Sequence, residues 1–340
     1  MTCSVDIVVS EAFAHLAELI AKDSTRIGKA VHLHESILTE RSAYLPLSLP
    51  GVWSANRSSR MVEARDGWIA VNLPRESDFE LLPAWIDCTL DTEPWSAIAE
   101  AARDHQATDL VGAGQQIGLA VAGVGTIAST ETNAPLMHMG GHESGPAKSL
   151  PLRVIDLSAL WAGPLCGAIL AEAGADVLKI DSTTRPDGGA FYKRLNGMKS
   201  HLSLDFGKAA DVQRLRSEIL AADVLITSAR PRAFEQLDML PADIFRNNQA
   251  LVWVAITGYG WRDGGAGRVA FGDDAAAAGG LVRWSEGRPL FFGDAIADPL
   301  TGLAAAAAAF EALSMGGGYM VDASLARTAA GVAHKLIPQD

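Results

Sequence analysis

The chain has 340 residues, of which 49% are hydrophobic and 20% charged, and its formal net charge at pH 7 is −12. This length allows two domains with sizeable cores, and the composition is typical of a globular protein. The acidic balance, with no cluster of Lys and Arg, excludes a nucleic-acid partner from the expected functions.

Residues 1–59 are expected to form an N-terminal helical segment. Within it, Glu11–Ala21 has the periodicity of an amphipathic helix. Acidic residues occur early in the segment, so we expect no signal peptide.

Residues 60–127 are expected to form a small α+β domain. Asp66–Gly67 predicts a turn that leads into a strand of alternating character. Ser77 is followed three residues later by Glu80, which matches the capping-box pattern of a helix start. Two helical stretches and a short apolar strand follow between residues 95 and 124.

Residues 128–150 are rich in Ser, Thr, Gly and Pro and predict a linker. His138 and His142 lie in it at i, i+4 spacing, which brings two metal ligands together only on a helix. The adjacent glycines argue against a helix. We therefore favour two solvated loop histidines over a metal site.

Residues 151–340 alternate between apolar strands and helices. This alternation predicts a parallel, Rossmann-like α/β sheet covered by helices, with right-handed crossovers. The expected strands are Arg153–Leu157, Asp176–Ile180, Ser200–Leu204, Asp223–Thr227 and Leu251–Ile256. The expected helices are Gly163–Ala173, Ala209–Ala221, Pro241–Asn247 and Leu300–Leu313, with a last strand or helix at Tyr319–Arg327.

The first turn of this sheet argues against a bound dinucleotide. A pyrophosphate-binding turn needs the pattern G-x-G-x-x-G, but the segment 158–164, SALWAGP, has one glycine, a bulky Trp and a proline. Asp181 follows where a ribose-binding acid would stand. Without the glycines, we interpret it as a solvated carboxylate at a strand end.

The cysteines and the apolar runs indicate in which cellular compartment the protein is expected. Cys3, Cys88 and Cys166 lie far apart and form no metal-ligand spacing, so we expect free thiols, no metal site and a cytoplasmic location. The longest apolar run, around Leu303–Leu313, is alanine-rich and contains Glu311. It is too short and too weakly hydrophobic to cross a bilayer, so no membrane partner is expected.

Six stretches between residues 150 and 330 carry a family pattern in the same order. They read IDLSALWAGPLCGAILAEAGADVLKID, NGMKSHLSLDF, AADVLITSARPRAFEQL, LVWVAITGYG, GDAIADPLTGLAAAAAAFEAL and GGGYMVDASL. Together they resemble the class III CoA-transferases, a family that includes formyl-CoA transferase, the carnitine CoA-transferase and the α-methylacyl-CoA racemases. DGWIAVNL and GLAVAGV resemble the family's small domain, which normally follows the large-domain segment and here precedes it. The chain therefore resembles either a rearranged member or one portion of a longer repeated architecture.

The resemblance implies a CoA-transferase that uses acyl-CoA and carboxylic acid substrates and holds no permanently bound cofactor. Family chains form interlocked homodimers, so we expect a homodimer here, although the rearrangement leaves the interlocking open. Two other functions also stay open: an α-methylacyl-CoA racemase or epimerase, and a CoA-binding protein without activity.

The resemblance assigns the nucleophile to Asp298. Family members attack the acyl-CoA thioester with an aspartate that precedes a helix of small residues, and ADPLTGLAAAAAAFEAL matches that segment. From the residues alone, Asp298 before Pro299 is typical of a helix N-cap. The two roles are compatible, because a helix N-terminus favours the anionic carboxylate. Asp294 is the rival acid.

The same resemblance implies a set of CoA contacts at the strand ends. These positions are Trp161, Ala162, Lys179, Leu204, Ser228, Ala229, Arg230, Pro231 and Arg232. Two of them, Arg230 and Arg232, replace residues of the family turn and are suited to the phosphates of CoA. An exposed, solvated turn is the alternative for both. For Lys179, at a strand end, the alternative is a plain surface position.

Family racemases pair the aspartate with a histidine in a Gly-His-Asp segment. The matching stretch is Gly272-Asp273-Asp274, so Asp273 stands at the histidine position. A carboxylate is less suited than histidine to proton abstraction near neutral pH. This difference disfavours the racemase, and we expect the two acids to cap a helix at Ala275–Gly279.

Overall fold

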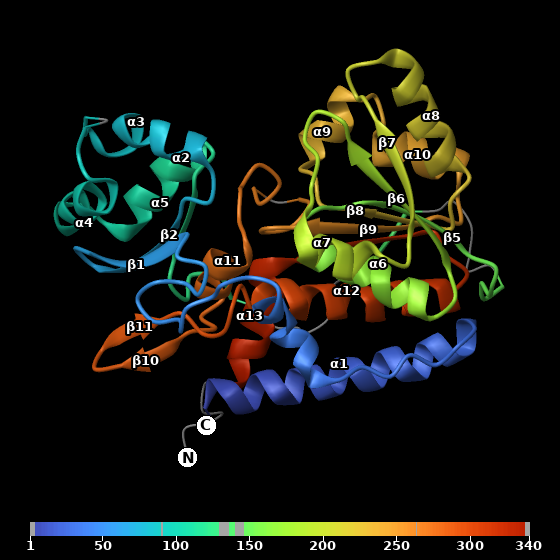
Figure 1. Ribbon diagram of the computed structural model, residues 1–340, viewed down its shortest axis with the longest axis horizontal. Coiled ribbons are helices and arrows are strands. Elements are labelled where there is room, and N and C mark those ends of the chain that lie inside the picture. The colour runs from blue at the N-terminus through green and yellow to red at the C-terminus, as the bar shows by residue number, and fades with distance from the viewer. Residues whose placement is uncertain (1–3, 90, 129–135, 140–145, 263, 337–340) are drawn as a thin grey trace.

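The computed structural model describes residues 4–89, 91–128, 136–139, 146–262 and 264–336. Two lobes stand side by side over a long helix, α1 (Val5–Ile27), as Figure 1 shows. The described part of the chain has no helix long and apolar enough to cross a membrane.

A seven-stranded sheet of order β4-β12-β9-β8-β5-β6-β7 forms the larger lobe. Six strands run parallel: β5 (Arg153–Leu157), β6 (Asp176–Ser182), β7 (Ser200–Leu204), β8 (Val224–Thr227), β9 (Val252–Thr257) and β12 (Tyr319–Ser324). Their spatial order is 3-2-1-4-5-6, that of a doubly wound sheet, and the winding direction reverses between β5 and β8. The expected Rossmann-like α/β fold is confirmed.

Helices cover both faces of this sheet because its strands are apolar on both sides. On β5, Val154 faces the core beneath α6 (Ala162–Glu172) and α12 (Ala297–Ser314). The next residue, Ile155, faces the opposite core, under α8 (Ala209–Leu220), α9 (Pro231–Gln236) and α10 (Pro241–Asn247). A further helix, α7 (Gly189–Asn196), connects β6 to β7.

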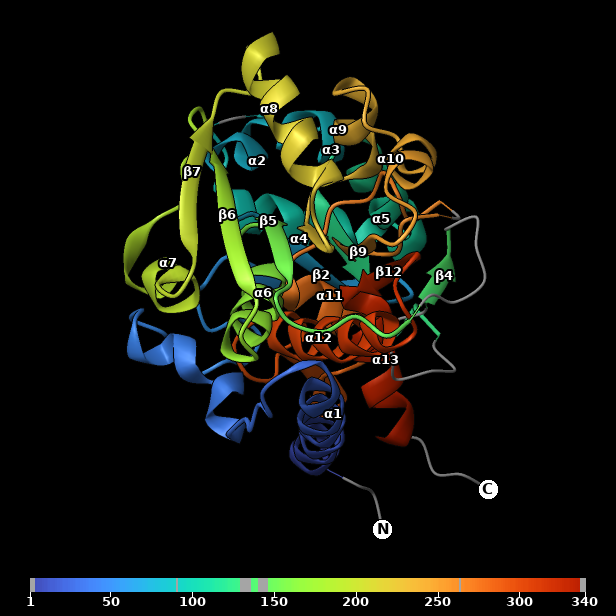
Figure 2. The same cartoon turned by 90° about the vertical axis from the view of Figure 1, so that its right-hand side faces the viewer.

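The long helix α12 is the centre of the larger lobe. Its alanine run is buried on every side, and α1 lies along its outer face as an additional layer (Figure 2). On another face, α6 comes close to α12 because Gly302 has no side chain: a Cβ at this position would lie 2.7 Å from the carbonyl oxygen of Ala162. The helix α13 (Leu325–Ala333), which follows β12, packs against α12 as well.

The smaller lobe holds the antiparallel sheet β1-β2-β3. Its elements are β1 (Ser59–Ala64), β2 (Gly67–Asn72), α2 (Glu76–Glu80), α3 (Leu82–Ile86), α4 (Pro94–Asp104), α5 (Ala107–Gln116) and β3 (Ala120–Gly123). The capping box predicted at Ser77 is wrong. The N-cap of α2 is Arg75, whose backbone N–H donates to the Asp78 carboxylate at 3.0 Å, because Asp78 stands three residues after that cap.

The two lobes share a core. Met61 and Ala70 of the small sheet pack against Ala277 and Phe291 of the larger lobe. Ala277 belongs to α11 (Gly272–Ala278), which is followed by the hairpin β10 (Arg283–Ser285) and β11 (Arg288–Leu290). Three short 3-10 helices complete the described elements: η1 (Glu35–Leu38), η2 (Glu40–Ala43) and η3 (His334–Leu336).

The predicted linker at 128–150 contains a strand. β4 (Leu136–His138) pairs antiparallel with β12 and forms the edge of the large sheet. The ring of His138 packs edge-on against Tyr319 with centroids 5.1 Å apart. The strand is only three residues long, so it leaves no measurable alternation in a segment rich in turn-forming residues. His142 lies outside the described residues.

Candidate active site

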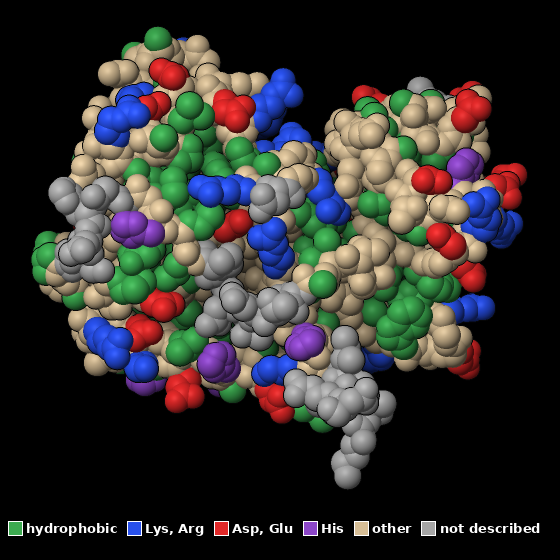
Figure 3. Space-filling model, turned by 180° about the vertical axis from the view of Figure 1, so that it is seen from behind, with side chains coloured by type: hydrophobic (Ala, Val, Ile, Leu, Met, Phe, Trp, Pro, Cys, Tyr) green, Lys and Arg blue, Asp and Glu red, His purple; other side chains and the backbone are tan. Residues whose placement is uncertain are grey.

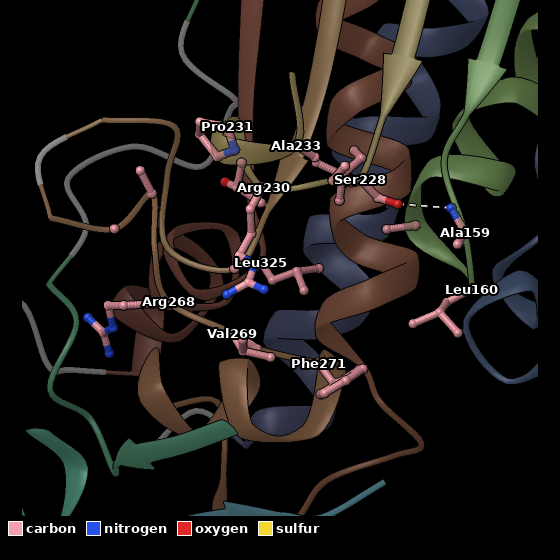
Figure 4. A pocket seen from close by; sticks show the side chains of 18 of the residues that line it. Ala159, Leu160, Ser228, Arg230, Pro231, Ala233, Arg268, Val269, Phe271 and Leu325 are labelled. Atoms are coloured by element: carbon pink, nitrogen blue, oxygen red, sulfur yellow. Dashed lines mark hydrogen bonds between the residues drawn. The ribbon is translucent and has the colours of Figure 1, made fainter. Parts of the chain in front are cut away.

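A cavity of about 540 Å³ opens where β5, β8 and β9 end (Figure 4). This is the point at which the winding of the sheet reverses, the usual ligand position in doubly wound folds. Its size is within the range of small-molecule sites. The β5 and β8 ends are linked, because the backbone N–H of Ala159 donates to Ser228 Oγ at 2.9 Å.

The turn after β5 closes one wall of the cavity. Leu160 adopts a positive φ of 68°, and its side chain is 58% exposed at the mouth. The helix α6 starts directly beneath: a Cβ at Gly163 would lie 2.2 Å from the Cβ of Ser158. The single glycine of this turn therefore serves the contact between turn and helix.

Five arginines line the cavity although the whole chain is acidic. Arg230 and Arg232 come from the start of α9, Arg185 from the segment after β6, Arg268 from the segment after β9, and Arg75 from the small lobe. Seen from behind, Lys and Arg side chains gather along the hollow between the lobes (Figure 3). This arrangement gives the cavity a local positive potential suited to an anionic ligand.

The cavity continues toward the small lobe. An adjoining hollow of about 480 Å³ shares Arg75, Arg230 and Arg232 with it and reaches the segment 115–118 at the end of α5. Two of the three shared arginines donate hydrogen bonds to backbone carbonyl groups. Arg230 donates to Gly267 O at 3.4 Å, and Arg75 donates to Gly118 O at 3.2 Å.

Asp298 lines the cavity from the N-terminal turn of α12. It is the second residue of that helix, whose N-cap is Ile296, and its side chain makes no capping hydrogen bond. Its carboxylate lies against Gly272 instead: a Cβ at position 272 would be 2.4 Å from Asp298 Oδ2. A larger residue at 272 would therefore displace the carboxylate.

Burial raises the pKa of Asp298 to about 7, and the charges of Asp273 and Asp294 add to the rise. The charge of Arg41 and the backbone N–H of Gly272 act in the opposite direction. The expected effect of the helix N-terminus, worth about 0.3–1 kcal/mol or less than one pKa unit, is outweighed. The carboxyl therefore titrates near neutrality.

Asp273 and Asp294 lie beside Asp298 but have their own partners. Asp273 is fully buried, accepts a hydrogen bond from the Ala295 N–H at 3.0 Å, and has its pKa raised to about 7 by burial and by Asp294. Asp294 accepts two hydrogen bonds from the guanidinium of Arg41. Of these three acids, Asp298 alone lines the cavity.

The profile of CoA-transferase family III matches residues 151–339. The chain belongs to CoA-transferase family III. A CaiB/baiF CoA-transferase family protein of Caenorhabditis elegans is 33% identical over 109 residues, 32% of this chain and 31% of that protein. The succinyl-CoA:mesaconate CoA-transferase of Haloarcula hispanica is 29% identical over 175 residues, 44% of this chain and 43% of that enzyme.

A solved structure agrees with this family III assignment. A CAIB/BAIF family protein from Brucella suis superposes with a TM-score of 0.50 at 28% identity, covering 54% of this chain and 55% of that one. The α-methylacyl-CoA racemase of Mus musculus is also related, at 31% identity over 32% of this chain and 28% of the racemase. The family III chain thus spans less than half of each of these curated relatives.

The structure brings most of the predicted CoA contacts of this family III chain to the cavity. Its walls include Ala162, Ser228, Ala229, Arg230, Pro231 and Arg232. The other three predicted contacts, Trp161, Lys179 and Leu204, are buried and do not line it. Two of them have partners in the interior: the ring of Trp161 packs edge-on against Phe191, and Lys179 donates to Ser158 O at 2.8 Å.

The predicted caps of α11 are half right. Asp274 accepts from the Phe271 N–H at 2.9 Å and closes the N-terminus of α11, whereas Asp273 holds the segment before α12. The two acids are consecutive residues in the first turn of α11, so their side chains point in different directions. Each therefore accepts a hydrogen bond from a different backbone N–H group.

Sequence reasoning missed Arg75, Arg185 and Arg268. Only Arg185 carries a usable signal, because it follows a parallel strand whose end lies at the ligand-binding edge. In the described residues, no group of three or more His, Cys, Asp or Glu side chains is arranged to hold a metal ion.

Proposed function

We propose that this chain transfers coenzyme A between carboxylic acids, with Asp298 as the nucleophile. The observation that carries the proposal is that Asp298 shares one cavity with five arginines. The reaction needs a carboxylate that can attack the thioester carbonyl carbon, and guanidinium groups are suited to binding the phosphates of CoA. The family assignment supports the same reaction.

The proposed reaction starts at the thioester. A carboxylate oxygen of Asp298 adds to the acyl carbonyl carbon, the C–S bond breaks, and CoA thiolate leaves with the electron pair, which gives an aspartyl anhydride. The thiolate then attacks the aspartyl carbonyl carbon and expels the first carboxylic acid as its anion. The product is an aspartyl-CoA thioester.

The acceptor acid repeats these steps in reverse. Its carboxylate attacks the aspartyl-CoA carbonyl and releases the thiolate, which then attacks the acceptor's carbonyl carbon in the new anhydride. This yields the new acyl-CoA and restores the Asp298 carboxylate. No proton transfer to carbon is needed at any step, so one carboxylate in the cavity is sufficient.

In this proposal the remaining residues bind and orient the substrate. Arg230 and Arg232 pair with CoA phosphates, while Ala162 and Ser228 border the path from the phosphates to Asp298. The turn after β5 limits water access on that side, which protects an anhydride from hydrolysis.

The decisive test is trapping of the intermediate. The purified protein is incubated with acetyl-, propionyl- and succinyl-CoA and analysed by peptide mass spectrometry. We expect a CoA adduct on the peptide that contains Asp298, and its absence in Asp298→Asn. Asp243→Asn is the matched control, because Asp243 also lies in the first turn of a helix but outside the cavity. CoA binding without any adduct would support the non-catalytic alternative instead.

The racemase alternative requires proton exchange at the α carbon. A second acid or base would have to reach the substrate from the other face, but Asp273, at the histidine position, is buried and does not line the cavity. We expect no deuterium incorporation from heavy water into the acyl chain during CoA exchange. Incorporation without CoA exchange would select the racemase.

Homodimer formation and the cytoplasmic location stay predictions from the sequence. Light scattering of the purified protein would test the first.

A further inference from the structure

Arg41 reaches the acidic cluster from a part of the chain that the family profile does not match. It belongs to η2, more than 250 residues before Asp298 in the sequence. Its Nε donates to Asp294 Oδ2 at 2.6 Å, and a second guanidinium nitrogen donates to the other carboxylate oxygen. The two side chains are 16% and 10% exposed, so the pair is largely shielded from water.

A further contact fixes the guanidinium. It lies over the ring of Trp161, 5.2 Å from the ring centroid, in a cation–π arrangement. Trp161 is the N-cap residue of α6 and directly precedes Ala162, which lines the cavity. Arg41 therefore sits behind the cavity wall, between the start of α6 and the start of α12.

The charges that act on Asp298 come from three elements. Asp273 belongs to α11, Asp294 precedes α12, and Arg41 comes from η2; the Gly272 N–H adds a hydrogen bond. The two acids disfavour the ionised form of Asp298, and Arg41 favours it. Arg41 also neutralises Asp294 directly by its two hydrogen bonds.

We propose that Arg41 is a positioning residue for the Asp298 nucleophile: by neutralising Asp294 and opposing the charge of Asp273, it favours the ionised form of the Asp298 carboxyl. The catalytic role of Arg41 rests on the proposed function. Its effect on the titration of Asp298 can be tested in the protein without any reaction taking place. The two hydrogen bonds need the planar fork of arginine, and lysine supplies only the charge.

A structural role for the same segment is the alternative. Glu40, the neighbour of Arg41, pairs with Arg194 of α7 at 3.0 Å and also anchors η2. Arg194→Gln therefore loosens the same segment without touching the acidic cluster, and it is the matched control.

The experiment measures the titration of Asp298 directly. Aspartate labelled with ¹³C at the carboxyl carbon is incorporated into the wild type, Arg41→Gln, Arg41→Lys and Arg194→Gln, and the Asp298 signal is assigned by its loss in Asp298→Asn. We expect Arg41→Gln to raise the midpoint by about one pH unit, Arg41→Lys to restore much of it, and Arg194→Gln to leave it unchanged. An unchanged midpoint in folded Arg41→Gln overturns the inference.

Two further readouts separate this inference from the proposed function. Asp294→Asn removes the acid and frees the guanidinium, so the Asp298 midpoint should fall; a rise or no change overturns the inference even if Arg41→Gln does not fold. The pH profile of adduct formation should move with the midpoint. A shifted midpoint in a protein that forms no adduct with the three acyl-CoA thioesters refutes the proposed function and leaves the electrostatic role intact.

Discussion

The side-chain amide of Asn72 donates a hydrogen bond to Asp274 at 2.9 Å across the junction of the two lobes. Both side chains are buried, and neither Asn72 Oδ1 nor Asp274 Oδ2 has a partner among the described residues. Burial raises the pKa of Asp274 to about 7. The carboxyl is therefore protonated in mildly acidic solution, where its proton can satisfy one of these two oxygens.

This pair predicts a stability that falls as the pH rises. The folded protein keeps the Asp274 proton up to about pH 7, while the unfolded chain loses it near the ordinary carboxyl pKa, so ionisation favours unfolding across that window. Urea denaturation at pH 5 and pH 8 should show a smaller stability at pH 8. Asp274→Asn should reduce this difference, and an unaltered difference would contradict the assignment.

Asp273 should set the pH range of the proposed reaction. Its charge raises the pKa of Asp298, and Asn at this position can still accept the hydrogen bond from the Ala295 N–H. We expect wild-type adduct formation to increase with pH through about 7, because the carboxylate is the attacking form. Asp273→Asn should move this increase to lower pH, as measured by the initial rate of adduct formation between pH 5 and 8.

Arg232 should contribute to CoA affinity rather than to the chemical step. It lines both hollows. A hydrogen bond to a charged group is worth about 1.5–3 kcal/mol, so Arg232→Gln should weaken CoA binding by about tenfold or more in calorimetry, and by less at high salt. Arg246→Gln, on the exposed surface of α10, is the control and should bind CoA as the wild type does. Equal affinities in both variants would exclude Arg232 from the phosphate site.

Lys199 should be essential for stability. Its ammonium is fully buried and donates to Asp156 at 2.7 Å, to Pro164 O and to Asn196 Oδ1. Lys199→Met removes the cation of a buried ion pair and leaves the Asp156 carboxylate with the hydrogen bonds from Ser158, which costs about 3–5 kcal/mol. Lys208→Met breaks an exposed pair with Asp205 and should cost less than about 1 kcal/mol. Similar unfolding midpoints for the two variants would contradict this account.

The alternation of strands and helices made most of the large lobe predictable from the sequence. The predicted strands Arg153–Leu157 and Ser200–Leu204 coincide with β5 and β7. The first is a mainly apolar, buried segment, and in the second two leucines alternate with polar residues, as is typical of a half-exposed strand. The position of Asp298 at a helix start was also readable, since Asp-Pro before an alanine run is a strong local signal. That its side chain faces the cavity, and does not cap the helix, depends on Gly272 and was not readable.

The rest of the site depends on contacts between residues that are distant in the sequence. Arg41 and Arg75 meet the acidic cluster and the cavity only after the N-terminal segment and the small lobe have packed, and neither lies in a motif. Lys179 is the opposite case: the family resemblance implied a CoA contact, but its ammonium turns inward to Asp181 at 2.8 Å and to Ser158 O. The sequence around Lys179 does not indicate in which direction its side chain points.

The close packing of α1 along α12 has a practical consequence for anyone who shortens this protein. Removing the first 150 residues would preserve the whole region that the family profile matches. It would also remove α1, which covers the alanine-rich face of α12, and Arg41, whose positive charge opposes the acids around Asp298. Such a fragment would keep every family motif but would expose apolar surface and tend to aggregate. Its lack of activity would therefore say nothing about the activity of the 340-residue chain.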